Sequence, residues 1–256
     1  HLQNTRRMQN ASRRTHLVAL DNYYRSMGLN EVTSFIKLRG TKKKRLRTIF
    51  SSEELIQLHD DHHHNLIQNY QRDINHTESH SRIILLSRQR NHAMLGLLVH
   101  QGLATSELDL LHINDLDLLK AKLTMERKGR KRTLPLHASQ IGALMHYIGQ
   151  VRPQFLDGKE ETGKLFLPLA ERASTGKANL SIKGAMRTLV AEARTLHPKL
   201  AKITQIRASV IAHWIKAEGL RKAQYLAGHG SINSTEEYLP DNLEELTEEL
   251  AKFNPF

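Results

Sequence analysis

The residues with the clearest capacity for chemistry lie between Ile203 and Leu239, near the end of the 256-residue chain. Arg207, His229 and Tyr238 occur there in this order, at the ends of short helical patterns. Arginine and histidine donate hydrogen bonds to phosphate oxygens, and a tyrosine hydroxyl is a nucleophile where its phenolate is stabilised or its proton is removed. The trio indicates phosphoryl chemistry, whereas the competing interpretation is an ordinary three-helix segment with one exposed tyrosine.

Apolar residues at helical spacing mark the helices that must position these side chains. We expect the first helix to end at Gly219, as helices do before a C′ glycine, and the second to break at Gly228. The run Ser234-Thr235-Glu236-Glu237 matches a capping box, which predicts a third helix with Tyr238 in its first turns.

The order of these motifs is similar to that of a known family. An Arg motif at 207–213, Gly-His at 228–229 and Ser-Thr-x-x-Tyr at 234–238 together resemble the C-terminal motifs of the tyrosine recombinase (phage integrase) family. The resemblance covers most of the chain, from about Ser51 to the end. It implies an α+β fold that is mostly helical, with a small antiparallel sheet. It also implies a site-specific recombinase or integrase of a mobile genetic element, acting in DNA integration and transposition.

The same resemblance implies roles for the three residues. Tyr238 is expected to attack the scissile phosphate of DNA and to form a 3′-phosphotyrosine, while Arg207 and His229 stabilise the charged transition state. Because the phosphotyrosine keeps the bond energy, neither a metal nor another cofactor is expected.

A second motif lies in the middle of the chain. The pattern of residues 113–136 predicts strands around a turn at Gly129, and hence a β-hairpin. In the family that it resembles, a hairpin lysine protonates the leaving 5′ oxygen, and Lys128 matches that lysine. Arg130 and Arg132 are expected to bind DNA. A basic hairpin tip is by itself often no more than exposed charge, so these assignments depend on the C-terminal motifs.

Two positions depart from the family pattern. Ala104 stands where the family has the first of its two phosphate-binding arginines, and Thr204 stands where it has His or Lys. A threonine can bond a phosphate oxygen, but it cannot carry a proton near neutral pH as histidine does. The chain therefore resembles integrases that lack the first catalytic arginine, and the alternative is a catalytically degenerate DNA-binding relative. We expect another cation to replace that arginine, and the candidates near in sequence are Arg88, Arg90 and His100.

The charge distribution favours a nucleic-acid partner. The net charge is +12 and the pI is about 9.9, which indicates a polyanionic partner. Segment 37–50 is strongly basic, and we expect it to run along DNA as a linker rather than only in solvent. Phosphate contacts would come from Lys42, Lys43, Lys44 and Arg45. Residues 1–36 resemble the final part of a helical core-binding domain, and residues 51–256 would form the catalytic domain.

The remaining sequence features limit the kinds of site and of partner that the chain can have. The absence of cysteine excludes thiolate metal sites, disulfides and a cysteine nucleophile. In segment 59–82, consecutive histidines do not share a helix face, so a solvated insertion is favoured over a metal site. The tail from Asp241 has an amphipathic helical pattern, which in the family docks on a neighbouring protomer. The resemblance thus implies double-stranded DNA, a homotetramer on two DNA sites and a cytoplasmic, nucleoid-associated bacterial protein; no apolar run is long enough to span a membrane.

Overall fold

The computed structural model describes residues 10–29, 33, 36, 48–73, 79–127, 129–156, 160–168 and 182–239. The chain divides into two compact units, His1–Arg45 and Leu46–Phe256. The smaller unit contains helix α1 (Asn10–Ser26), after which Gly28 has a φ of 74°. Residues 37–47 of the expected linker lie outside the described part, so the DNA contacts of Lys42, Lys43, Lys44 and Arg45 stay predictions.

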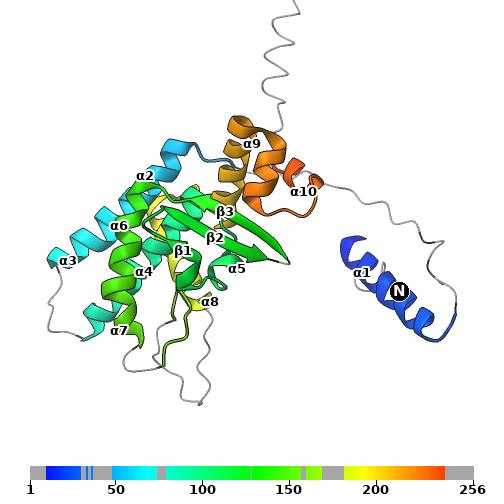
Figure 1. The fold of residues 1–256 in the computed structure, drawn as a ribbon, viewed down its shortest axis with the longest axis horizontal. Helices are drawn as coiled ribbons and strands as arrows, with labels where there is room; N and C mark the ends of the chain where they lie inside the picture. The colour runs from blue at the N-terminus through cyan, green and yellow to red at the C-terminus, as the bar shows by residue number, and fades with distance from the viewer. Residues whose placement is uncertain are drawn as a thin grey trace, which may run out of the picture. The chain divides into compact units, whose positions relative to one another are not determined.

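The larger unit is mostly helical and carries one small sheet (Figure 1). Its helices are α2 (Ser52–His63), α3 (Asn69–Asp73), α4 (Ser79–Gln101), α5 (Thr105–Leu108), α6 (Ala138–His146), α7 (Arg152–Leu156), α8 (Lys183–Leu196), α9 (Thr204–Ala227) and α10 (Asn233–Glu236). Short π-helical turns, His64–Gln68 and Tyr147–Val151, join α2 to α3 and α6 to α7, and a 3₁₀ turn spans Ile113–Asp115. The strands are β1 (Leu116–Asp117), β2 (Lys122–Arg127) and β3 (Arg130–Pro135). This arrangement confirms the predicted fold class.

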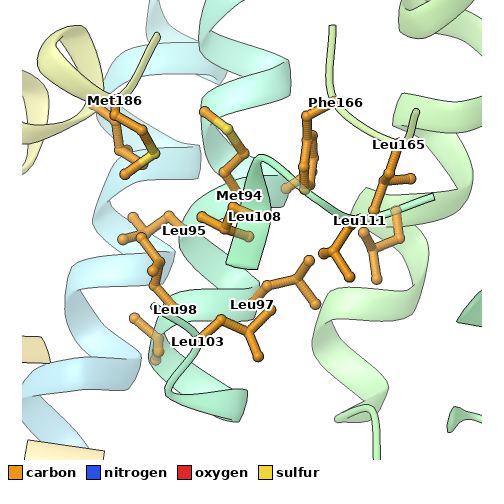
Figure 2. Close-up of a cluster of buried hydrophobic side chains, with 14 of the residues drawn as sticks. Met94, Leu95, Leu97, Leu98, Leu103, Leu108, Leu111, Leu165, Phe166 and Met186 are labelled. Carbon is orange, nitrogen blue, oxygen red and sulfur yellow. The ribbon is translucent and has the colours of Figure 1, made fainter. Parts of the chain in front are cut away.

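Helix α4 is the centre of the larger unit, because it packs against α2, α6, α8 and α9. All residues from 90 to 99 are buried, so the helix has no solvent face over this stretch. Figure 2 shows the apolar layer around it, in which leucines and Met94 of α4 meet side chains from the segments that follow. This layer includes Met94, Leu97, Leu98, Leu108, Leu111, Phe166 and Met186. Full burial of one such side chain contributes about 1.5–3 kcal/mol, so this layer is the main source of cohesion.

The sheet is a three-stranded antiparallel meander in the order β1-β2-β3. Gly129 has a φ of 71° and turns β2 into β3, as the sequence predicts. Leu123 and Leu134 are paired across the hairpin and both are buried. Side chains alternate between the two faces of a sheet along a strand. A residue two positions from Leu134 on β3 therefore points to the same buried face as Leu134. Strand β3 packs against α9, and this contact brings the hairpin to the C-terminal helices (Figure 1).

The C-terminal helices follow the predicted breaks, with one correction. Gly219 interrupts α9 with a φ of 80°, and Gly228 ends it in the left-handed conformation. The capping box at 234–237 is wrong: α10 starts at Asn233, and Ser234 and Thr235 lie inside it. The backbone amides of these two residues donate to the carbonyls of Ser231 and Ile232, so no side-chain cap is needed there. Tyr238 lies in the turn after α10 instead of within a helix.

The histidine-rich start of segment 59–82 is another correction. Ser51 caps α2, and its side chain accepts from Glu54 N at 3.1 Å. His59 and His62 are one turn apart on the face of α2 that meets α4, and both are buried rather than solvated. Within the described residues, no group of three His, Asp or Glu side chains has a geometry that fits a metal ion. None of the described helices combines the length and apolar character required to cross a membrane.

Candidate active site

Arg207, His229 and Tyr238 meet at one end of α9. Arg207 lies in the first turn of α9, and His229 follows the left-handed Gly228 at its other end, 3.3 Å from Nε2 to Arg207 Nη2. The ring of Tyr238 lies over that of His229, with centroids 5.5 Å apart and planes inclined by 25°. The kink at Gly219 makes this possible, because a straight helix of 24 residues would separate its ends by about 35 Å.

The contacts of His229 define its tautomer. An arginine only donates, so Nε2 of His229 accepts the hydrogen bond from Arg207. Nδ1 then carries the proton and donates to Thr235 Oγ1 at 2.9 Å, which fixes the ring from α10. Burial lowers the pKa of His229, and the positive charges of Arg207 and Arg132 lower it further. The imidazole is therefore held neutral and ready to gain a proton when an anion arrives.

Arg207 is held by backbone carbonyls as well as by charge. Its Nη2 donates to Ala227 O at 2.8 Å, and its Nη1 donates to Gly102 O at 2.5 Å. Burial lowers the pKa of Arg207, while the Glu107 carboxylate and a hydrogen bond with Tyr238 act in the opposite direction. A guanidinium remains charged after such a shift. The fold thus keeps a rigid cation beside the tyrosine hydroxyl.

Glu107 is a functional candidate that the sequence analysis did not single out. Its side chain is 3% exposed, and its Oε2 accepts from Ala104 N at 2.7 Å at the start of α5. Oε1 accepts from Arg132 Nη2 at 2.9 Å, and Oε2 lies 3.4 Å from Arg207 Nη1. The sequence feature that could have identified it is its position three residues after Ala104. A glutamate at this N3 position accepts a hydrogen bond from the backbone amide of the N-cap residue.

The two hairpin arginines that are expected to bind DNA differ in exposure, and their contact with DNA stays a prediction. Arg130 is exposed, whereas the side chain of Arg132 is only 5% exposed. Two residues on, Leu134 is buried on the same face of β3, and this alternation is the signal that predicts an inward side chain. Lys128, the expected general acid, lies outside the described residues, so its role stays a prediction.

A cavity of about 270 Å³ opens between the hairpin and the end of α9. Its lining is basic and polar, and none of the described residues that line it carries a carboxylate. Arg130, Lys131, Arg132, Arg221, Gln224, Tyr225, Gly228, His229 and Gly230 line it. Such a lining suits a phosphate group. Its arginines and its lysine only donate hydrogen bonds, and its histidine donates from both ring nitrogens once it is protonated.

The two positions that depart from the family pattern supply no cation of their own. Ala104 is the N-cap residue of α5 and contributes only its backbone amide to Glu107. Thr204 is exposed at the start of α9. The three candidates for a replacement cation were wrong, because their side chains contact other parts of the core. Arg88 donates to Leu66 O, Arg90 donates to Leu167 O, and His100 stacks on His137.

Comparison with known proteins agrees with the motifs. The Phage integrase family matches residues 76–245. The tyrosine recombinase XerC of Pelotomaculum thermopropionicum is 30% identical over 173 residues, which cover 65% of this chain and 54% of the relative. The tyrosine recombinase XerC of Roseiflexus castenholzii is 35% identical over 156 residues, covering 59% and 47%. The chain thus spans about half the length of the curated relatives that it matches.

Solved structures share the fold at low sequence identity. The XerH site-specific recombinase bound to a palindromic difH substrate, in a post-cleavage complex, has a TM-score of 0.66 and 18% identity, covering 98% of this chain and 69% of that one. The XerA recombinase has a TM-score of 0.53 and 19% identity, covering 100% and 80%. The fold and the match over residues 76–245 lead to one conclusion: the chain belongs to the phage integrase family of tyrosine recombinases.

Proposed function

We propose that the chain is a site-specific DNA recombinase, or integrase, of a mobile genetic element. The observation that carries this proposal is the meeting of Arg207, His229 and Tyr238, with Nη2 of Arg207 3.3 Å from His229 Nε2 and the two rings stacked. Its substrate is double-stranded DNA. The curated relatives are tyrosine recombinases, and this supports the same reaction class for this chain.

In the proposed reaction, a scissile phosphate enters between Arg207 and His229. Arg207 then donates to a phosphate oxygen instead of to His229 Nε2, and the anion favours protonation of the imidazole. The oxygen of Tyr238 bonds to phosphorus as the bond from phosphorus to the 5′ oxygen breaks. The hydroxyl proton of Tyr238 passes to Nε2 of His229, which Arg207 no longer occupies, and the 5′ oxygen takes a proton from Lys128. Attack of a 5′ hydroxyl on the 3′-phosphotyrosine reverses these steps and frees Tyr238.

The larger assembly follows from the same proposal. Residues 1–36 would belong to a core-binding domain, residues 37–50 to a linker on DNA, and residues 51–256 to the catalytic domain. Four copies would act on two DNA sites, with the tail beyond Asp241 docking on a neighbour. A DNA-binding relative without catalysis is the weaker alternative, since the nucleophile, Arg207 and His229 are all retained at one place.

Covalent capture tests the proposal without knowledge of the DNA site. The full chain is incubated with a library of nicked duplexes that carry a randomised core, and adducts that survive denaturation are recovered and sequenced. We expect the wild type to enrich one sequence, and Tyr238→Phe to yield no adduct while binding that sequence with nearly unchanged affinity. Removing one hydroxyl deletes the nucleophile and little packing area. Adducts formed equally by Tyr238→Phe would assign the nucleophile elsewhere, and no adduct with the wild type would overturn the function.

The linker has its own test on the recovered sequence. Each phosphate that the protein no longer neutralises should lower the slope of log affinity against log salt by about 0.9. Neutralising Lys42, Lys43, Lys44 and Arg45 together should therefore flatten the slope markedly. An unchanged slope would make this segment a solvated connection only.

A further inference from the structure

The proposed site has a deficit of donors at Ala104. A pentavalent phosphorus concentrates charge on its non-bridging oxygens, and preorganised donors aimed at those oxygens contribute most to catalysis of this kind. Ala104 has no side-chain donor, and Thr204, at the other departed position, is exposed. The residues around Glu107 show where a second guanidinium is available.

The strand register brings Arg132 to the inner side of the hairpin. On β3, Arg132 shares its face with Leu134 and is paired across the ladder with Met125, which is also buried. A basic residue on that face is unusual, since charged side chains are almost never fully buried unless they are paired. Arg132 is therefore directed at a specific partner instead of at solvent.

That partner is the carboxylate that closes the helix start at Ala104. Glu107 Oε1 accepts from Arg132 Nη2 at 2.9 Å. The other oxygen accepts from Ala104 N at 2.7 Å and lies 3.4 Å from Arg207 Nη1. One carboxylate thus holds two guanidiniums, one from β3 and one from α9, next to the position that lacks the family arginine.

Arg132 also reaches the phosphate side of this arrangement. Its Nη1 lies 1.8 Å from where a Cβ on Gly228 would be, so only glycine lets the guanidinium approach the residue before His229. Arg132 and His229 line the same basic cavity. The Nε of Arg132 is buried and has no hydrogen-bond partner among the described residues. A guanidinium that only completed an ion pair would have no need to lie against the cavity.

We propose that Arg132 supplies the second guanidinium of the phosphate site, in place of the arginine that Ala104 lacks. The inference rests on the proposed recombinase function. Arg132 and Arg207 would contact the two non-bridging oxygens of the scissile phosphate, with Glu107 fixing the separation between them. The site would then keep its charge, with the cation supplied from β3 instead of from the start of α5.

Single-turnover cleavage of the captured DNA sequence tests this proposal. Arg132→Met should reduce the rate of covalent attachment about 10²–10³-fold, the typical effect of removing one donor to a developing oxyanion. Arg152→Met is the matched control, because Arg152 is equally buried at 4% exposure and is also paired with a glutamate, Glu161. The control should cleave at the wild-type rate. Thermal unfolding shows whether each variant folds. If Arg132→Met does not fold, the rate of covalent attachment is measured with Arg132→Lys, which keeps the pair with Glu107.

Two further measurements separate catalysis from structural support. A methylphosphonate at the scissile position removes one negative charge, so the deficit of Arg132→Met should shrink to a few-fold on that substrate. Adding Ala104→Arg to Arg132→Met should restore cleavage at least tenfold, since the donor returns by the other route. Ala104→Arg alone should leave cleavage flat or reduce it, because a third guanidinium would compete for the carboxylate that already holds two.

The outcomes distinguish this inference from the function on which it rests. If the wild type forms no covalent adduct, the proposed function fails and the inference with it. If the wild type cleaves and Arg132→Met cleaves within threefold of it, only the inference is wrong. It is equally wrong if Arg132→Met is slowed by the same factor on phosphodiester and methylphosphonate, since that result identifies a structural role.

Discussion

The buried charges around Glu107 and the buried histidines between α2 and α4 differ in how the fold accommodates ionisable groups. We call Arg132, Arg207, Glu107 and His229 the phosphate cluster, and His59, His92 and His100 the histidine cluster. In the phosphate cluster the charges are kept, because each guanidinium has the same carboxylate as partner. In the histidine cluster the rings of His59 and His92 stack with centroids 4.1 Å apart, and the carboxylate of Asp60, 3.9 Å from His59 Nδ1, is 68% exposed.

The histidine cluster instead loses its charge. Burial, with a smaller contribution from neighbouring histidines, lowers the pKa of His92 to about 2 and that of His59 to about 3. Nε2 of His59 and Nδ1 of His92 have no hydrogen-bond partner among the described residues. These rings act as flat apolar groups at neutral pH. The comparison teaches that the same unit keeps charge where an anion is to bind, and suppresses charge where only packing is required.

The largest expected effect comes from removing the central charge of the phosphate cluster. Glu107→Gln leaves two buried guanidiniums without their carboxylate, and breaking a buried pair in this way costs about 3–5 kcal/mol. Urea denaturation measures the change in the free energy of unfolding.

Glu161→Gln is the control for this change. Glu161 also pairs with a buried arginine, but its side chain is 54% exposed, so its replacement should cost no more than about 1 kcal/mol. Equal losses of stability in the two variants would mean that burial of the carboxylate does not decide the stability of the phosphate cluster.

The two clusters also differ in what the sequence could reveal. The family motifs marked Arg207, His229 and Tyr238, and glycines marked the breaks that bring them together, since a left-handed φ has a local cause. Glu107 was missed, and the inward direction of Arg132 was not predicted, because these two partners are 25 residues apart and come from different elements. Nothing local in the sequence indicated that His59 of α2 and His92 of α4 would stack on each other.

The second expected effect is smaller and concerns how the free energy of unfolding depends on pH, which tests the histidine cluster. The folded pKa of His92, about 2, is below its unfolded value near 6.5, so the unfolded chain binds the extra proton below pH 6.5. Stability is thus fully present above pH 6.5 and is lost as the pH falls, by about 2 kcal/mol for this one group at pH 5. His92→Phe should remove that share of the loss between pH 7.5 and pH 5, without changing DNA cleavage.

His80→Phe is the control for the pH experiment. His80 is exposed on the same helix, α4, so its replacement should leave the pH dependence of unfolding as in the wild type. If His92→Phe and the wild type lose equal free energy on acidification, the histidine cluster is not held neutral, and the contrast between the two clusters disappears.

The smallest expected effect is the response of the two clusters to an inorganic anion. The phosphate cluster has more donors than carboxylate oxygens, whereas the neutral histidine cluster has no charge for an anion to meet. Inorganic phosphate at about twice its dissociation constant should therefore stabilise the fold by about 0.6 kcal/mol, compared with chloride at equal ionic strength. General salting effects of phosphate are common to all variants and cancel in the comparison. Arg132→Met should lose this increment and His92→Phe should keep it. An increment that survives in Arg132→Met would place the anion elsewhere on the basic surface, because binding at the cavity requires the guanidinium that faces Gly228.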